Sequence, residues 1–122
     1  MRPGEPNPDS VEVDLPPGSV VLRTSGSTGR PRRIVLPPQA FEASTLAAAA
    51  RLGLGEDDVW WASLSPAHVG GLSLILRADR LRSGLELTGP FDASTFWELC
   101  AAGRITHASL VPTMLRWVLE TR

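Results

Sequence analysis

From residue 59 onward, the chain alternates between short runs rich in β-forming residues and longer segments with helical periodicity. Each β-rich run is apolar and bounded by turn residues, which predicts strands at residues 59–64, 85–87 and 105–111. Helices are predicted over residues 68–83, after the capping residue Asp92, and from Pro112 onward. This alternation favours an α/β fold, in which helices flank a mostly parallel sheet.

The segment before residue 59 predicts two more strands and a helix. Two β-rich runs, 19–23 and 33–36, flank a loop of small residues. The following segment, 39–52, is rich in alanine and therefore helical. Pro37 and Pro38 can open this helix, and Gly53 is suited to end it. Residues 1–18 contain five prolines and are expected to form a flexible lead-in. Residues 19–122 are then expected to form the folded domain.

The composition excludes several classes of protein. The 122 residues carry a formal net charge of −1, and all 12 cationic side chains are arginine. Nucleic acid is not an expected partner, because the chain has no basic field. We also expect no membrane association, because the apolar stretches are too short to cross a bilayer. A single cysteine and the lack of a signal-like start favour a cytoplasmic protein.

The loop between the first two strands is suited to binding an anion. Its glycines let backbone N–H groups converge, its hydroxyls add donors, and Arg32 can bond phosphate oxygens. The candidate phosphate-binding residues are Thr24, Ser25, Gly26, Ser27, Thr28, Gly29 and Arg32. The lysine-containing phosphate loop is excluded, because the chain has no lysine. The alternative interpretation is a Ser/Gly-rich hairpin loop without chemistry.

The order of residues in this loop, Thr-Ser-Gly-Ser-Thr-Gly-Arg-Pro-Arg, resembles the phosphate loop of the adenylate-forming, or AMP-binding, superfamily. Two later blocks, 64–72 and 106–115, resemble further elements of this superfamily in the same order. The resemblance covers residues 19–122 and is greatest to the o-succinylbenzoate–CoA ligases of menaquinone synthesis. It implies that the domain is part of the large N-terminal domain of such an enzyme.

The resemblance also implies a reaction and a set of roles. Members of the superfamily use ATP and Mg²⁺ to convert a carboxylic acid into an acyl-adenylate, and many then transfer the acyl group to CoA. The loop residues 24–29 would hold the β- and γ-phosphates, and Arg32 stands where the family usually has lysine. His68 would lie beside the acyl carboxylate and the adenylate, and Gly70 and Gly71 would shape the acid pocket. No metal ligand is implied within this chain.

The sequence also departs from the family pattern. Ala67 replaces the usual aromatic residue, and Pro66 is displaced by one position. The chain contains no tyrosine and no lysine, whereas the family uses a tyrosine-containing adenine motif and a catalytic lysine. We therefore expect an incomplete ligase with negligible activity alone and an uncovered apolar surface. The alternatives are a non-catalytic nucleotide- or phosphate-binding module, half of a split ligase that needs a second polypeptide, and a purely structural or interaction domain.

Other conspicuous residues have structural interpretations. Trp60 and Trp61 are expected to be one core and one surface residue of a strand. Cys100 is expected to pack on the apolar face of its helix. His107 is expected to point into the sheet or its edge, without a chemical role.

Overall fold

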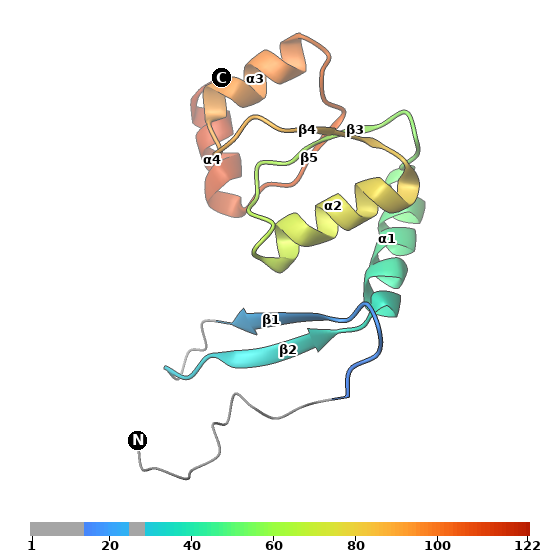
Figure 1. The fold of residues 1–122 in the computed structure, drawn as a ribbon. Helices are drawn as coiled ribbons and strands as arrows, with labels where there is room; N and C mark the ends of the chain where they lie inside the picture. Colours follow the sequence, from blue (N-terminus) through green and yellow to red (C-terminus); the bar gives the residue numbers. More distant parts are fainter. Residues whose placement is uncertain (1–13, 25–28) are drawn as a thin grey trace.

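The computed structural model describes residues 14–24 and 29–122. Within these residues, β4, β3 and β5 form a three-stranded sheet in that order, and β1 and β2 form a separate two-stranded sheet (Figure 1). The strands are β1 Val20–Thr24, β2 Arg32–Leu36, β3 Val59–Trp61, β4 Gly84–Glu86 and β5 His107–Ala108. The helices are α1 Pro38–Leu52, α2 Val69–Leu81, α3 Ala93–Ala101 and α4 Pro112–Glu120. The predicted α/β class is confirmed.

The first two strands form an antiparallel hairpin outside the parallel sheet. Val20 pairs with Leu36 at one end and Thr24 pairs with Arg32 at the other. Gly29, in the connection between them, has a φ of 76°, a backbone conformation that favours glycine. The sequence predicted both strands but did not predict this pairing. In Figure 1 the hairpin lies apart from the sheet and leads directly into α1.

The first helix has the ends that the sequence predicted. Pro38 occupies its first turn, where no backbone donor is needed. Gly53 follows the helix in a left-handed conformation, and its N–H donates to the carbonyl of Ala49. The side chain of Thr45 is buried on this helix. The hairpin is therefore joined to the rest of the domain by a helix with defined ends.

The parallel sheet is centred on β3. Trp60 pairs with Leu85 of β4 on one side and with His107 of β5 on the other. The strands are shorter than predicted, because the β-rich runs 59–64 and 105–111 extend beyond the paired residues. Single backbone hydrogen bonds continue next to the paired residues, from Ala62 to the Glu86 carbonyl and from Thr106 to the Val59 carbonyl.

The two tryptophans of β3 lie on opposite faces of the sheet, and both are buried. Trp60 forms a core with Leu74 and Ala78 of α2. Trp61 contacts Phe91 and Phe96 on the other face, with ring centroids 5.6 and 5.9 Å away. The prediction that one of the tryptophans faces the surface was wrong, since helices cover both faces of the strand.

The third helix begins at its predicted cap. The carboxylate of Asp92 accepts hydrogen bonds from the backbone N–H and the hydroxyl of Thr95, at 2.7 and 2.9 Å. Leu99 provides the buried contact of this helix. Cys100 is exposed, so its predicted packing role was wrong: the neighbouring Leu99 occupies the inward position.

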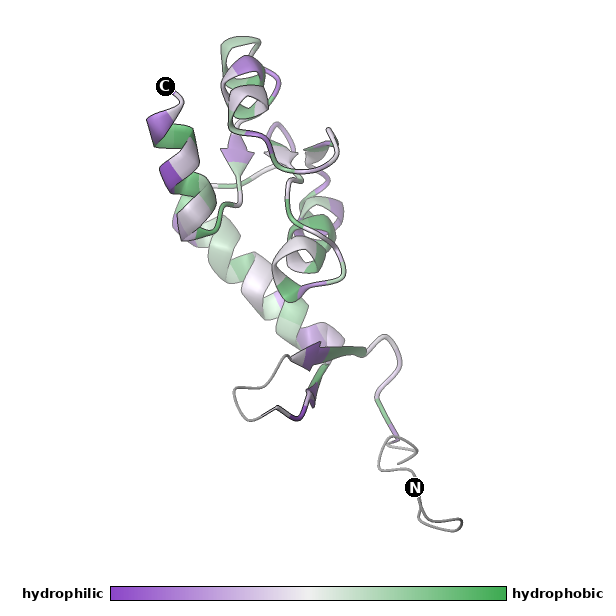
Figure 2. Ribbon diagram, turned by 90° about the vertical axis from the view of Figure 1, so that its left-hand side faces the viewer, coloured by the Kyte–Doolittle hydropathy of each residue, from purple (hydrophilic) through white to green (hydrophobic). Residues whose placement is uncertain are grey.

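The last helix exposes much of its apolar surface. Leu115, Val118 and Leu119 have the spacing of one helical face, but of the three only Val118 is buried. Leu115 and Leu119 are 48% and 60% exposed, and Figure 2 shows apolar and polar residues alternating along this helix. Trp97 of α3 donates a hydrogen bond to the carbonyl of Val118, which ties the two helices together. An uncovered apolar surface was predicted and is present here.

His107 lies at the edge of the sheet, as expected. Its ring stacks on Trp60 at a centroid distance of 4.9 Å, and its Nδ1 lies 3.3 Å from the carboxylate of Asp58. Thr106 donates to the same carboxylate at 3.0 Å. These contacts fasten β5 to the residue that precedes β3. Over the described part of the chain, every helix is too short or too polar to cross a bilayer.

Candidate anion-binding cleft

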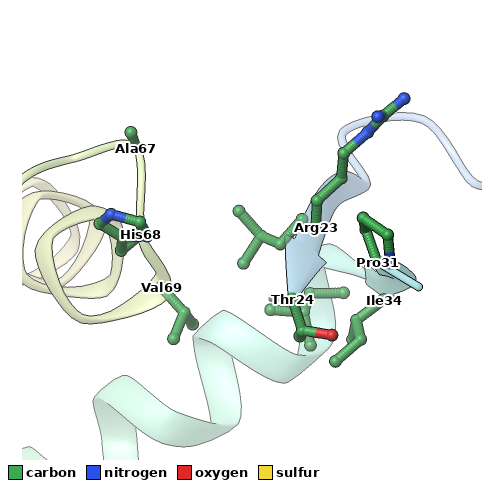
Figure 3. Close-up of a pocket in the computed structure, with 9 residues that line it drawn as sticks. Arg23, Thr24, Pro31, Ile34, Ala67, His68 and Val69 are labelled. Atoms are coloured by element: carbon green, nitrogen blue, oxygen red, sulfur yellow. The ribbon is translucent and has the colours of Figure 1, made fainter. Parts of the chain in front are cut away.

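A cleft of about 730 Å³ separates the hairpin from the start of α2. Ala67, His68 and Val69 form one side of it, and hairpin residues form the other (Figure 3). The hairpin residues are Leu22, Arg23, Thr24, Pro31, Ile34 and Leu36. The fold therefore brings together two segments that the sequence analysis singled out separately.

The hairpin presents one face to this cleft. Directly paired residues of an antiparallel ladder point to the same side, and successive residues alternate. Leu22 pairs with Ile34, and Thr24 pairs with Arg32, so these four residues share one face of the hairpin. Leu22, Thr24 and Ile34 line the cleft, and Arg32 is not among its lining residues. Figure 3 shows the Arg23 side chain extending away from α2, as alternation requires. The register thus places the predicted cation Arg32 on the same face as Thr24.

The remaining predicted phosphate-binding residues have different positions. Gly29 precedes the return strand, which begins at Arg32, and does not line the cleft. Ser25, Gly26, Ser27 and Thr28 lie outside the described residues. Thr24 and Arg32 flank this segment and are hydrogen-bonded to each other, with the Thr24 hydroxyl 3.5 Å from the Arg32 carbonyl. The assignment of the loop to phosphate therefore stays a prediction, and Thr24 at one end of the loop lines the cleft.

The opposite side of the cleft is the N-terminal end of α2. His68 is the N-cap residue, but its side chain makes no capping hydrogen bond, and the first turn contains no acidic residue. The first N–H groups of a helix lack intrahelical acceptors and form the positive end of its dipole. This side is therefore electrostatically suited to an anion. His68 is exposed, so its imidazole is accessible from the cleft.

The two glycines of α2 do not line this cleft. A methyl group on Gly71 would lie 2.1 Å from the Ser65 carbonyl oxygen, so the helix and the preceding loop touch backbone to backbone there. A methyl group on Gly70 would meet only the Leu64 side chain, at 3.4 Å. Gly71 therefore sets how closely the loop carrying His68 packs on α2. The predicted role of both residues in shaping an acid pocket stays a prediction.

A second cleft, of about 660 Å³, lies at the carboxyl ends of β3 and β4. Ligands of open parallel sheets bind at this end of the strands. The loop between β3 and α2 separates the two clefts, because residues 62–66 line the second and residues 67–69 line the first. The second cleft also contains Phe91 and Met114. Sequence reasoning missed it, since its residues are far apart in the chain and share no motif.

The cleft has no acidic side chain among its described lining residues. The hairpin contributes the Thr24 hydroxyl to the lining, and the start of α2 contributes His68 and Val69. Among the described residues, no group of three or more His, Cys, Asp and Glu side chains could hold a metal ion. The described part of the cleft is therefore better suited to an anion than to a cation.

Comparison with protein families identifies one match along almost the whole chain. A model described as AMP-binding enzyme matches residues 5–122. The 2-succinylbenzoate–CoA ligase of Bacillus mycoides (strain KBAB4) is 32% identical over 109 residues, which make up 89% of this chain and 23% of that protein. The chain thus spans about a quarter of the length of this relative.

Solved structures show the same similarity. The o-succinylbenzoate CoA synthetase of Bacillus subtilis in complex with the acyl-adenylate intermediate OSB-AMP superposes with a TM-score of 0.77 and 28% identity, covering 84% of this chain and 27% of that chain. A structure of the same enzyme with ATP and a magnesium ion has the same TM-score and identity, covering 84% of this chain and 22% of that one.

Proposed function

Because the chain belongs to the AMP-binding enzyme family, we propose that it takes part in the ATP-dependent activation of a carboxylic acid for transfer to CoA. In this reaction the carboxylate attacks the α-phosphorus of ATP, and pyrophosphate leaves. The CoA thiolate then attacks the acyl carbon, and AMP leaves. The observation that carries the proposal is the cleft between the phosphate-loop hairpin and His68.

Each side of the cleft has its own role in the proposal. Thr24, the loop to Gly29, and Arg32 bind the β- and γ-phosphates, where preorganised donors stabilise the charge of the leaving pyrophosphate. Guanidinium is suited to this role, because it bonds two phosphate oxygens at once. His68 lies at the positive end of α2 and orients the carboxylate toward the α-phosphorus. Mg²⁺ on the phosphates would neutralise further charge.

We propose o-succinylbenzoate as the acid. The support is the similarity to 2-succinylbenzoate–CoA ligases and to an o-succinylbenzoate CoA synthetase that binds OSB-AMP. The second cleft is lined mostly by apolar residues and adjoins the loop that carries His68. It would take the organic part of the acid while the carboxylate remains at His68. The same similarity makes CoA the proposed acceptor.

The proposal assigns the other parts of the site to polypeptide outside these 122 residues. The family's adenine motif contains tyrosine and its catalytic cation is lysine, and neither residue type occurs here. A second polypeptide carrying those parts would make this chain half of a split ligase. The alternative is a non-catalytic nucleotide-binding module. Both assign MgATP to the same cleft, and they differ in whether added polypeptide restores catalysis.

Calorimetric titration of the 122-residue chain with MgATP tests the cleft. We expect binding that weakens by about a hundredfold or more in the double variant Ser27→Ala plus Thr28→Ala, since each hydrogen bond to a charged group is worth about 1.5–3 kcal/mol. Ser44→Ala, which removes an exposed hydroxyl from α1, is the matched control and should leave affinity unchanged. Equal affinities for the double variant and the control would refute the assignment.

ATP–pyrophosphate exchange tests the reaction. With Mg²⁺ and a panel of acids that includes o-succinylbenzoate, we expect no exchange by the chain alone. Exchange that appears when the remaining part of a 2-succinylbenzoate–CoA ligase is added would support the split ligase, and binding without any exchange would support the module. Acid-dependent exchange by the chain alone would contradict the proposed incompleteness and would name the substrate.

A further inference from the structure

A small pocket of about 300 Å³ lies where the start of α3 meets the end of α4. It is lined by Phe91, Asp92, Ala93, Trp117, Glu120 and Thr121. The rings of Phe91 and Trp117 lie 6.0 Å apart between centroids, at an interplanar angle of 33°. Phe91 also packs against the buried Trp61, so one wall of the pocket is anchored to the core. Trp117 is 47% exposed and presents much of its surface to solvent.

The charges around this pocket are negative. Asp92 and Glu120 supply two carboxylates, and no cationic residue lines the pocket. Hydrogen bonds from Thr95 hold the pKa of Asp92 below its usual range, which keeps this carboxylate ionised. The pocket also adjoins the C-terminal end of α4, whose last turn contains no basic residue. The partial negative charge of a helix C-terminus adds to the attraction for a cation.

The nearest cations leave the pocket open. Arg116 lies 3.9 Å from Glu120 along the same helix, and both side chains are about two-thirds exposed. Such a pair is weak, because solvent screens it. The guanidinium of Arg122 lies over Trp97, 5.6 Å from the ring centroid, and does not line the pocket. Two carboxylates and two aromatic rings are therefore available to a cation from outside.

We propose that this pocket binds an arginine side chain of a partner polypeptide. A guanidinium can stack on the Trp117 ring while its N–H groups reach a carboxylate in bidentate geometry. An ammonium group cannot make this planar contact. The volume suits one side chain, since it is at the lower limit for small-molecule pockets. This inference is independent of the ligase reaction, because the anion-binding cleft shares none of the lining residues.

The test is an NMR titration that follows the indole N–H signal of Trp117. The probe is the peptide acetyl-Gly-Arg-Gly-amide, and the comparison peptide carries citrulline, which has nearly the same shape as arginine but no charge. We expect a saturable shift with the arginine peptide and a much smaller one with the citrulline peptide. Equal shifts with the two peptides, or no saturable shift with the arginine peptide, would overturn the proposal.

Four variants locate the binding. Trp117→Leu, followed through backbone amides of α4, should weaken binding by about two- to fivefold, as expected for an exposed cation–π contact. Glu120→Gln and Asp92→Asn should also weaken it, and asparagine preserves the helix cap. Glu98→Gln removes a charge from α3 outside the pocket and should bind as the parent chain does. If Glu98→Gln weakens binding as much as Glu120→Gln, the attraction is general charge and the pocket assignment fails.

Discussion

Arg80 holds Glu42 with two hydrogen bonds from Nε, at 3.0 and 2.9 Å, and a third from Nη2 at 2.8 Å. The pair joins the last turn of α2 to the early part of α1. Because α1 follows the hairpin directly, this contact lies next to the junction between the hairpin and the remainder of the domain. A cavity of about 250 Å³ borders the pair, with Val20 and Leu76 among its lining residues.

The Glu42–Arg80 pair should make a small contribution to stability that depends on pH. Hydrogen bonds from Arg80 lower the pKa of Glu42 from its usual value of 4.5. The ionised form of Glu42 is therefore favoured in the folded state. The pair contributes fully to stability above the usual pKa of 4.5, and this contribution is lost as the pH falls through the lowered pKa. We expect Glu42→Gln to lower the melting temperature slightly at neutral pH and by less at about pH 3. Both side chains are about half exposed, so about 1 M salt should also shrink the difference. An equal difference at both pH values would contradict this origin.

Gly71 and Gly70 should respond in opposite ways to the same substitution. In Gly71→Ala the new methyl group would meet backbone atoms of Ser65 and Leu64, so the loop must move, at a cost of about 1–3 kcal/mol or more. Gly70→Ala adds a methyl in ordinary contact with a flexible side chain, and alanine favours the helix by up to about 1 kcal/mol. Chemical denaturation of both variants measures this. Similar destabilisation by the two substitutions would show that the close backbone contact is not the cause.

The side chain of Trp61 should be among the most important for stability. It is fully buried, and its indole N–H donates to the hydroxyl of Thr88 at 2.8 Å. Trp61→Ala should cost about 3–5 kcal/mol, and Trp61→Phe should cost less, because the ring contacts with Phe91 and Phe96 are partly kept. Leu119→Ala, at a position that is 60% exposed, serves as the control and should change stability by no more than about 0.5 kcal/mol. Unfolding curves that rank these variants differently would contradict the assignment of the core.

Asp92 should stabilise α3 through hydrogen bonding at the cap more than through its charge. Asp92→Ala leaves the N–H of Thr95 without its acceptor, and the melting temperature should fall by several degrees. Asparagine retains a side-chain oxygen at the same place, so Asp92→Asn should remain close to the parent. Thermal unfolding monitored by circular dichroism distinguishes the two. A loss in Asp92→Asn as large as in Asp92→Ala would assign the effect to charge instead.

The features that sequence predicted well are governed by local chemistry. Pro38 begins α1, Gly53 ends it, and Asp92 caps α3, because each depends on the residue's own backbone preference or nearest donors. Strand lengths were less predictable. β5 contains only two paired residues of the expected 105–111, since pairing depends on what the neighbouring strand offers.

The errors concern contacts between distant segments. Composition and periodicity place Trp60 and Trp61 on opposite faces, but burial of both requires a helix on each face, which only the topology decides. Leu99 rather than Cys100 faces inward, because the direction of α3 relative to the sheet sets its buried side. The motif identified His68. Its position opposite the hairpin could be seen only in the folded structure, and so could the second cleft.

The central place of β3 has a consequence for how the domain folds. Its two partners both follow it in the chain, and the pairing partners of Trp60 are Leu85, 25 residues later, and His107, 47 residues later. The entropic cost of closing a loop rises by about 0.6 kcal/mol for each doubling of its length. Pairing of β3 with β4 is therefore favoured as the earlier step. The two-residue β5 then joins a template that β3 and β4 have already formed.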